Sequence, residues 1–266
     1  MNAPDVTTAP DVRTVIETRP EGEVARITWH NSARLNVLDR AGMEALTTAI
    51  RALMRRQNLR VLVLAGAGER AFIGGADVRA MVGLDPITAR GFITALHRVS
   101  EAIRAMPVPV IARMAGYTLG AGLEIAAACD LRIAAEDARM GMPEVRLGIP
   151  SVIEAALLPS LVGWGRTRRL LLTGEMVDAP TALIWGLVEE VVPAAALDAA
   201  VGRLVDSILA GAPEAVRAQK HLIRDWEDAT TAEATARGID AFAAAWTSAE
   251  PVRRMQAFLE RRKVGG

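Results

Sequence analysis

Two glycine-containing segments and the glutamates near them hold the residue types that could do chemistry in this sequence. GYTLGAGLEIAAACD, residues 116–130, places glycines ahead of Glu124, and AFIGGADV, residues 71–78, places two glycines ahead of Ala76. Glycine lets the backbone approach a ligand closely and adopt turns that other residues avoid. A helix that begins at such a turn presents free N–H groups to the space in front of it. Each segment therefore predicts a backbone amide donor at the mouth of a pocket.

Glu124 and a second glutamate, Glu144, give this predicted pocket two acid–base groups. If a helix starts near Gly120, Ala121 and Glu124 lie three residues apart and share one helix face. Glu144 stands in ARMGMPEVRLGIPS, twenty residues further on and directly after a proline. Two carboxylates beside two amide donors suit proton transfer next to a carbonyl whose oxygen gains negative charge. Two carboxylates near one water also repel, so we expect one to be protonated and the other ionised.

Three better-known glycine motifs do not fit residues 116–130. A dinucleotide-binding fingerprint needs a third glycine where Ile125 stands. A phosphate-binding loop needs Gly-Lys-Ser or Gly-Lys-Thr, and a nucleophile elbow needs a serine where Ala121 stands. Cys129 has no histidine near it in the sequence, and we interpret it as a small buried hydrophobic residue. An oxyanion-type site with an acid or base beside it remains.

The elements that would position these residues alternate between strands and helices over the first two thirds of the chain. RTVIET and VARITW alternate in polarity and predict an antiparallel hairpin. RVLVLAG, VIARMAG and LRIAA are apolar runs typical of strands buried on both faces. RAGMEALTTAIRALMRRQ predicts a helix with Asp39 as its N-cap, and residues 86–105 predict another. From about Pro193 onward only helical patterns occur, so we expect the last third to be all-helical.

Composition narrows the classes of function. The 31 basic and 31 acidic residues cancel, which argues against a nucleic-acid partner or an anionic membrane surface. No apolar stretch reaches the roughly 18 uncharged residues of a membrane span, and the first residues lack the pattern of a signal peptide. A single cysteine fits a reducing compartment, so we expect a soluble cytoplasmic protein. His30, His97 and His221 are scattered without ligand spacing, and we expect no metal site.

Four separated motifs together resemble the enoyl-CoA hydratase/isomerase (crotonase) family. They are AFIGGADVRAM, PVPVIARMAGYTLGAGLEIAAACDLRIAAEDARMGMPEVRLGIP, LLLTGEMVDAPTALIWGLVEEVVP and MQAFLERRK, and the resemblance runs from about Val12 to Lys263. It implies an α/β fold with a crotonase-like spiral of ββα units over residues 11–195 and a helical trimerisation region over residues 196–266. It also implies a homotrimer, or a hexamer built as a dimer of trimers. Residues 1–10 are predicted to form a disordered tail.

The resemblance implies roles for the residues of the predicted pocket. The thioester oxygen of an acyl-CoA substrate would lie between the N–H groups of Ala76 and Ala121. Glu124 would activate the water that adds to the β-carbon, and Glu144 would deliver a proton to the α-carbon. The presence of both glutamates favours hydration over the other reactions of the family. CoA would arrive as part of the substrate, so no separate cofactor is expected.

Contacts with the CoA part of the substrate are implied in the same way. The carbonyl of Gly74 would meet the adenine, and three arginines would lie near the phosphates. Two residues of the C-terminal helix would reach the CoA site of a neighbouring subunit. Each arginine has a second interpretation as a solvated surface charge. The arginines are Arg34, Arg70 and Arg79, and the two residues of the last helix are Phe258 and Arg261.

One segment departs from the family pattern and leaves the choice of substrate open. After Pro150, where the family usually has a glycine-rich loop, this chain has SVIEAALLPSLVG. The amide of Ser151 would replace that of a family glycine in holding the water. Glu154 adds a third carboxylate. We interpret Ser151 and Glu154 as a capping box ahead of an apolar helix, with a catalytic role for Glu154 as the alternative.

The sequence therefore predicts an enzyme that hydrates a 2-enoyl-CoA thioester to a 3-hydroxyacyl-CoA. Two alternatives stay open. One is double-bond isomerisation, or another acyl-CoA reaction on the same site, in which a glutamate moves a proton and no water adds. The other is a non-catalytic RNA-binding or scaffolding role, against which the balanced charge counts. Acyl-chain length and branching depend on the shape of the pocket and are not predicted.

Overall fold

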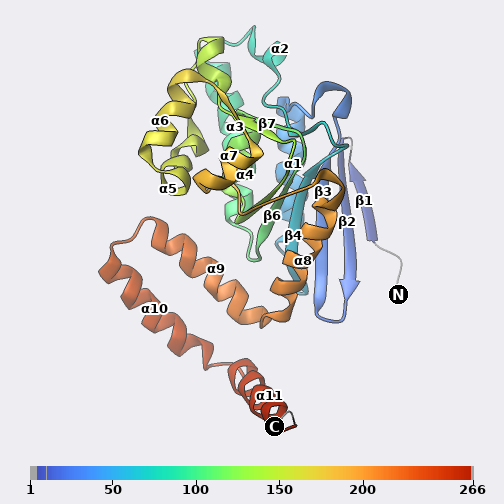
Figure 1. Ribbon diagram of the computed structural model, residues 1–266, viewed down its shortest axis with the longest axis vertical. Helices are drawn as coiled ribbons and strands as arrows, with labels where there is room; N and C mark the ends of the chain where they lie inside the picture. The colour runs from blue at the N-terminus through green and yellow to red at the C-terminus, as the bar shows by residue number, and fades with distance from the viewer. Residues whose placement is uncertain (1–4, 10, 265–266) are drawn as a thin grey trace.

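The computed structural model describes residues 5–9 and 11–264. Two β-sheets form its core, helices cover both faces of the larger sheet, and an arm of helices leaves the core toward the C-terminus (Figure 1). The larger sheet has the order β1-β2-β3-β4-β6-β8-β11. In that order its strands span Asp5–Ala9, Val12–Arg19, Gly22–Trp29, Leu59–Gly66, Val110–Met114, Leu131–Ala135 and Glu190–Val192.

The first three strands form an antiparallel meander. β2 and β3 pair along their whole lengths, as the alternating patterns predicted. β1 pairs antiparallel with β2, so the structure differs over Asp5–Ala9 from the predicted disordered tail, residues 1–10. The β-branched residues of DVTTA favour extended backbone, and the edge of β2 offers them hydrogen-bond partners. The rest of the predicted tail, residues 1–4 and 10, lies outside the described residues.

β4, β6 and β8 are parallel strands in the middle of the sheet, as their apolar runs predicted. Every residue of β4 is buried. One face of the sheet packs against α1 (Arg40–Leu53) and α3 (Pro86–Arg104), and the other against α8 (Leu197–Ala210). Leu62 belongs to the first core, whereas Val61 and Val63 belong to the second. Alternate residues of one strand therefore serve two cores, which explains why its sequence is continuously apolar.

The two long helices begin at acidic caps. Asp39 accepts a hydrogen bond from the N–H of Gly42 at the start of α1, as predicted. Asp85 accepts one from the N–H of Thr88 at the start of α3, which has Pro86 in its first turn. Both arrangements satisfy amides that the helix itself leaves without a partner.

A strand, a second strand and a helical segment recur three times in the middle of the chain. The first strand of each unit joins the larger sheet and the second joins the smaller sheet, whose order is β10-β9-β7-β5. β5, β7 and β9 are parallel, so they end at the same edge, where the helical segments begin. This is the predicted spiral of ββα units. Its remaining elements are β5 (Ala71–Ile73), α2 (Val78–Met81), β7 (Tyr117–Leu119), α4 (Ala121–Ala128), β9 (Arg139–Gly141) and η2 (Pro143–Leu147).

Helices dominate the rest of the chain, and no strand follows β11 in the described residues, as predicted. α8 packs on the larger sheet, and α9 is held to the core by Lys220, which donates to the carbonyl of Val108 and to Asp130. α10 and α11 extend away from the core (Figure 1). The elements not yet given are η1 (Ser32–Arg34), η3 (Ile153–Leu157), α5 (Leu158–Val162), α6 (Trp164–Thr173), β10 (Met176–Asp178), α7 (Ala179–Trp185), η4 (Ala194–Ala196), α9 (Pro213–Glu227), α10 (Thr231–Ala245) and α11 (Glu250–Val264).

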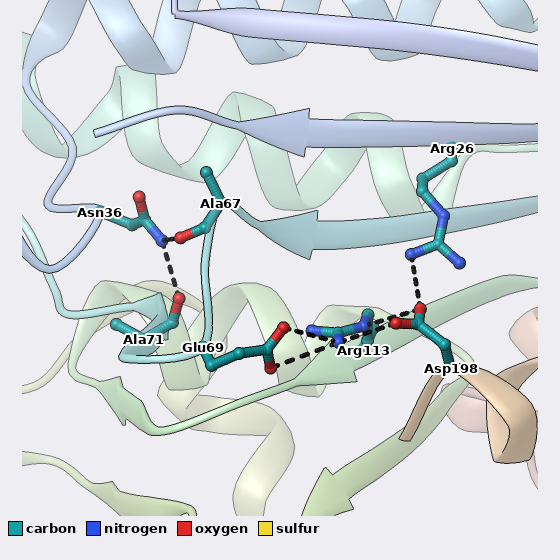
Figure 2. Close-up of polar contacts among 7 residues, drawn as sticks. All are labelled: Arg26, Asn36, Ala67, Glu69, Ala71, Arg113 and Asp198. Carbon is teal, nitrogen blue, oxygen red and sulfur yellow. Dashed lines mark hydrogen bonds and ion pairs between the residues drawn. The ribbon is translucent and has the colours of Figure 1, made fainter. Parts of the chain in front are cut away.

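A buried arginine fastens α8 to the larger sheet. Arg113 of β6 has a side chain only 6% exposed, and its Nε donates to Oδ1 of Asp198 at 3.0 Å. Its Nη2 donates to Glu69 at 3.0 Å, and Arg26 of β3 donates to Asp198 at 3.1 Å (Figure 2). The hydrogen bond from Arg113 holds the pKa of Asp198 below its usual value. Carboxylates on both sides thus compensate the buried guanidinium.

Asn36 fixes the turn that leads from β4 to β5. Its fully buried side chain donates from Nδ2 to the carbonyl of Ala67 at 3.0 Å and to that of Ala71 at 2.7 Å (Figure 2). Asn36 has φ +56°, a left-handed conformation that asparagine tolerates better than most residues. These two bonds position β5, which leads into the two glycines of AFIGGADV.

Candidate active site

A cavity of about 670 Å³ lies where the strands of the smaller sheet end. Its walls come from the segment after β5, from α2 and α3, from the first turn of α4, and from η2 and the residues that follow it. The lining is mostly apolar: Val78, Met81, Leu84, Phe92, Ile93, Leu96, Leu119, Leu147, Ile149 and Val152. Its charged side chains are Arg90, Glu124 and Glu144.

The glycine-rich turn ahead of α4 is required by close contacts. Gly120 has φ +51°, and a Cβ there would lie 2.2 Å from Oε1 of Glu144. A Cβ on Gly122 would lie 2.0 Å from the carbonyl oxygen of Ile73. α4 begins at Ala121, as predicted, so the N–H of this residue is one that the helix does not use. In the part of the chain that the structure describes, no acceptor receives this N–H, and Ala121 lines the cavity.

The other predicted donor, the N–H of Ala76, lies in the segment that follows β5. Leu38 donates to the carbonyl of Gly75 at 2.9 Å, and Asp77 donates back to the carbonyl of Leu38 at 2.7 Å. These two bonds fix the backbone on either side of Ala76, whose own N–H has no acceptor among the described residues. Ala76 lines the same cavity as Ala121. The structure therefore brings the two glycine segments together at one site.

Glu124 lies one turn beyond Ala121 on α4 and is almost completely buried, with 4% of its surface exposed. The N–H of Ala155 donates to its Oε1 at 3.3 Å. Burial, and to a smaller extent the negative charges of Glu144 and Glu154, raise the pKa of Glu124 to about 8. Glu124 therefore carries a proton near neutral pH.

Glu144 reaches the same cavity from η2 and is only partly buried. Its Oε1 lies against the backbone of Gly120, as the distance to a Cβ there shows. The hydroxyl of Ser151 donates to its Oε2 at 2.7 Å, a charge-assisted bond when Glu144 is ionised. The two glutamates thus share one cavity but have different neighbours.

The burial of Glu124 bears on the role that the resemblance gives it, and that role stays a prediction. A residue that activates water as a base must be ionised before the reaction. Burial instead favours the neutral form of Glu124, because a carboxylate loses its hydration when it is enclosed by α4 and η3. The pKa of Glu124 is raised to about 8 by this burial.

The capping box predicted for Ser151 and Glu154 is wrong. No side chain caps η3, the helical segment that follows Ser151. The hydroxyl of Ser151 donates instead to Glu144, an acceptor stronger than a neutral group. Glu154 is buried, with Oε1 2.7 Å from Nδ1 of His97. Ile153, with φ +41°, interrupts the regular helical backbone that a capping box requires.

The residues expected to contact CoA are only partly at the cavity. Gly74 lines it. Arg34 forms an ion pair with Asp77 at 2.7 Å, directly after the Ala76 turn. Arg70 and Arg79 are exposed and do not belong to the cavity lining. A CoA contact by any of these residues stays a prediction.

Phe258 and Arg261 stand on α11, in the arm of Figure 1. Phe258 is exposed and is not part of the cavity lining of its own chain, and the side chain of Arg261 lies outside the described residues. Their expected contact is with a neighbouring subunit, so it too stays a prediction.

Arg90 is a cavity residue that the sequence did not reveal. It lies on α3, whose span was predicted from periodicity. Periodicity identifies the buried face of a helix, but which positions border a cavity depends on how the helix lies against other segments. No motif in the sequence marked this arginine.

Cys129 and Asp130, at the end of the segment that carries Glu124, have structural roles. Cys129 is buried as predicted, and burial raises the pKa of its thiol to about 12, which leaves it unreactive. Asp130 accepts hydrogen bonds from the N–H of Val110 at 2.6 Å and from Nζ of Lys220 at 2.7 Å. Within residues 5–9 and 11–264, no group of three metal-ligating side chains is found. In the same residues no helix has the length and apolar character needed to cross a membrane.

Comparison with known proteins places this architecture in one class, the enoyl-CoA hydratases and isomerases. The profile of the enoyl-CoA hydratase/isomerase family matches residues 19–265. The short-chain-enoyl-CoA hydratase of Clostridium acetobutylicum is 34% identical over 247 residues, which cover 92% of this chain and 95% of that protein. The crotonyl-CoA hydratase of Syntrophomonas wolfei is 34% identical over 245 residues, which cover 92% and 94%.

Solved structures of enoyl-CoA hydratases are also similar to the fold of this chain. The enoyl-CoA hydratase of Bacillus anthracis has a TM-score of 0.87 at 30% identity, with 98% of this chain and 97% of that chain covered. The enoyl-CoA hydratase of Mycobacterium smegmatis has a TM-score of 0.88 at 29% identity, with 93% and 96% covered. The chain belongs to the enoyl-CoA hydratase/isomerase (crotonase) family and is an enzyme of that family, as its motifs predicted.

Proposed function

We propose that this enzyme adds water to a 2-enoyl-CoA thioester and forms a 3-hydroxyacyl-CoA. The observation that carries the proposal is the meeting of two glutamates and two backbone amides without acceptors at one cavity. Both curated relatives described above are named as hydratases of enoyl-CoA or crotonyl-CoA. CoA enters as part of the substrate, and the proposed reaction needs no further cofactor.

The amides of Ala76 and Ala121 would hold the thioester oxygen. When a nucleophile adds to the β-carbon, negative charge moves onto this oxygen as the thioester becomes an enolate. Two N–H groups that are already in place stabilise that charge without rearranging. Their backbones are fixed by the Leu38 bonds on one wall and by the start of α4 on the other.

The two glutamates would divide the proton transfers according to their surroundings. Glu144, helped by the hydroxyl of Ser151, would take a proton from the water whose oxygen bonds to the β-carbon. Glu124, which carries a proton near neutral pH, would give it to the α-carbon as the enolate collapses. One proton enters the pair and one leaves it, so the sum over the reaction is the addition of one water. This assignment exchanges the two roles that the family resemblance implies.

The apolar lining of the cavity would receive the acyl chain. Half of its ten large apolar side chains belong to α2 and α3, and Leu147, Ile149 and Val152 come from η2 and the residues after it. Burial of methylene groups there contributes about 0.8 kcal/mol each. The site therefore suits an uncharged hydrocarbon acyl group.

Isomerisation of a double bond is the second candidate. In this reaction an ionised glutamate takes a proton from one carbon, becomes neutral, and returns the proton to another carbon. Glu124 would suit the step in between, because its burial favours the neutral form that holds the proton. The two reactions differ in whether oxygen from water enters the product.

A reaction in ¹⁸O-labelled water tests the proposed function. Purified enzyme and crotonyl-CoA are expected to give 3-hydroxybutyryl-CoA with one ¹⁸O at the β-carbon, detected by mass spectrometry. A 3-enoyl-CoA that is converted to its 2-enoyl isomer, with no hydroxylated product from any 2-enoyl-CoA, would contradict hydration and support isomerisation.

We also propose that the region over residues 196–266 joins three chains into a trimer, alone or within a hexamer. α10, its C-cap residue Trp246 and α11 expose large apolar side chains, which on the two helices are Ile239, Phe242, Met255 and Leu259. Apolar surface of this kind marks a protein interface. Light scattering after size-exclusion chromatography is expected to give the mass of three or six chains, and a monomer at micromolar concentration would contradict the proposal.

A further inference from the structure

One short segment, residues 151–155, contacts both glutamates of the cavity. At its first residue, the hydroxyl of Ser151 donates to Oε2 of Glu144 at 2.7 Å. At its last residue, the N–H of Ala155 donates to Oε1 of Glu124 at 3.3 Å. A contact that fixes this segment therefore fixes a hydrogen bond to each of the two carboxyl groups.

The segment has little regular structure of its own to hold it in place. Ser151 and Val152 belong to no helix or strand, and no side chain caps η3, which begins at Ile153. Ile153 has φ +41°, which is strained for a β-branched residue. Strained backbone persists only where the surrounding structure enforces it. Residues 151–155 therefore depend on a tertiary contact.

Glu154 makes such a contact from the middle of the segment. Its Oε1 lies 2.7 Å from Nδ1 of His97, which stands on α3 and is half exposed. The side chain of Glu154 is 7% exposed, and Oε2 has no hydrogen-bond partner in the part of the chain that the structure describes. A buried polar group without a partner costs free energy, so this carboxyl group depends on its bond to His97.

α3 gives the segment a firm anchor. This helix starts with a capping box and Pro86, and its buried residues Phe92 and Leu96 line the cavity. His97 directly follows Leu96 in the sequence. The helix that forms the acyl wall is thus also the helix to which Glu154 is bound, and rigid elements place a site more precisely than loops do.

We propose that the hydrogen bond between Glu154 and His97 fastens residues 151–155 to α3 and so positions both glutamates of the cavity. The inference rests on the proposed function, in which both of these glutamates move protons. Neither Glu154 nor His97 lines the cavity, so both are positioning residues that act on the substrate only through the segment.

Alanine variants test the inference by removing the bond. Glu154→Ala and His97→Ala should each lower kcat for hydration of crotonyl-CoA by roughly 10- to 100-fold, because a small misplacement of a reacting group slows its reaction. KM should stay close to wild type, because the acyl wall is unchanged. Folded alanine variants with the kcat of the wild type would overturn the inference.

Conservative variants provide the matched controls. Glutamine at position 154 can donate or accept a hydrogen bond, so Glu154→Gln keeps the bond to His97. His97→Asn places an amide group near the position of Nδ1 and keeps it in the same way. Both variants should retain most of the wild-type kcat. A loss in Glu154→Gln as large as that in Glu154→Ala contradicts a role for the bond.

The double variant asks whether the two residues act through one contact. If they do, Glu154→Ala combined with His97→Ala should lose no more kcat than the worse of the two single variants. Losses that multiply would mean that the two side chains act separately, and they would contradict the inference.

A last readout does not depend on activity. Hydrogen–deuterium exchange followed by mass spectrometry should show faster exchange of residues 151–157 in Glu154→Ala, with the wild-type rate in Glu154→Gln. Exchange of α1 should not change, which separates local loosening of the segment from a loss of global stability. Unchanged exchange of residues 151–157 contradicts the inference. If the wild type hydrates no enoyl-CoA, the proposed function fails, and this measurement still decides whether the bond holds the segment.

Discussion

The two glutamates of the cavity show how surroundings can give one residue type two different tasks. Glu124 lies on a helix inside the core and is 4% exposed, and the backbone N–H of Ala155 donates to its carboxyl group at 3.3 Å. Glu144 lies on a short 3₁₀ segment, is partly exposed, and accepts a hydroxyl hydrogen bond at 2.7 Å. Burial disfavours the charged form of the first, whereas the second keeps access to solvent.

This difference teaches that a motif alone does not determine which of its two glutamates donates a proton and which accepts one. The motif predicts that both glutamates reach one pocket, and both line the cavity. The position of the proton depends on the density of packing around each carboxyl group. α4 is buried along its whole length, and this burial raises the pKa of its glutamate to about 8.

The largest expected effect comes from removing either carboxyl group. Glu124→Gln and Glu144→Gln should each lower kcat for hydration by roughly 10²–10⁴, because each removes one proton-transfer group. Steady-state kinetics with crotonyl-CoA measures this, with circular dichroism and oligomer mass as controls for folding. Near-normal turnover in either variant would show that the pair does not act together.

Exchange of the hydrogen at the α-carbon separates the two roles. A saturated acyl-CoA has no β-hydroxyl, so exchange in heavy water needs only the group that faces the α-carbon. Glu124→Gln should abolish exchange and Glu144→Gln should retain most of it, as followed by NMR. The opposite pattern would restore the roles implied by the family resemblance.

The next effect in size concerns the amide of Ala121. Ala121→Pro should fold, because Ala121 is the first residue of α4, where proline is tolerated. Gly120, with φ +51° and ψ −118°, has the mirror image of the extended conformation that precedes proline, which glycine adopts freely. Loss of one oxyanion donor should lower kcat by roughly 10²–10³.

Ala121→Gly keeps the N–H and serves as the control, with activity expected close to wild type. A folded proline variant of full activity would show that the thioester oxygen is held elsewhere. Circular dichroism and oligomer mass establish folding for both variants.

An effect of pH on stability, rather than on turnover, follows from the same difference in burial. The pKa of Glu124 is raised from 4.5 to about 8 in the folded protein. Between these values the unfolded chain loses a proton that the folded chain keeps, so this contribution to stability is complete below pH 4.5 and is lost by about pH 8. Relative to Glu124→Gln, the wild type should therefore lose about 1.4 kcal/mol per pH unit over this range. Urea unfolding of both proteins at pH 5, 6, 7 and 8 measures the change, and parallel curves would mean that Glu124 is not buried as a neutral group.

The smallest effect is expected at the hydroxyl that supports Glu144. Ser151→Ala removes a hydrogen bond to a carboxylate and should lower kcat by about tenfold with little change in KM, since one such bond contributes on the order of 1.5 kcal/mol. Ser151→Thr keeps the hydroxyl and should retain most of the activity. Equal losses in both variants would point to the shape of the wall rather than to the hydrogen bond.

Local patterns predicted much of the fold. The apolar run of β4, the Asp39 cap of α1 and the start of α4 at Ala121 follow from short segments of sequence, and the structure confirms them. The strand β1 escaped prediction because five residues of extended backbone form a strand only when the edge of β2 pairs with them, and local sequence does not reveal that pairing.

The candidate site was predictable only as far as its motifs reach. Glu124 and Glu144 stand in recognisable segments, and both line the cavity. The contact of His97 with Glu154 joins residues 57 positions apart and depends on how η3 packs against α3. A capping-box pattern is local and carries no information about such a partner, which is why the interpretation of Ser151 and Glu154 was wrong.

The pH dependence of kcat/KM for hydration of crotonyl-CoA by the wild-type enzyme tests the central claim most directly. This ratio reports the ionisation of groups in the free enzyme. If Glu124 gives its proton to the α-carbon, kcat/KM falls as pH rises through about 8, the pKa to which burial raises Glu124. A kcat/KM that increases through the same range would show that Glu124 acts as the base and would contradict the account.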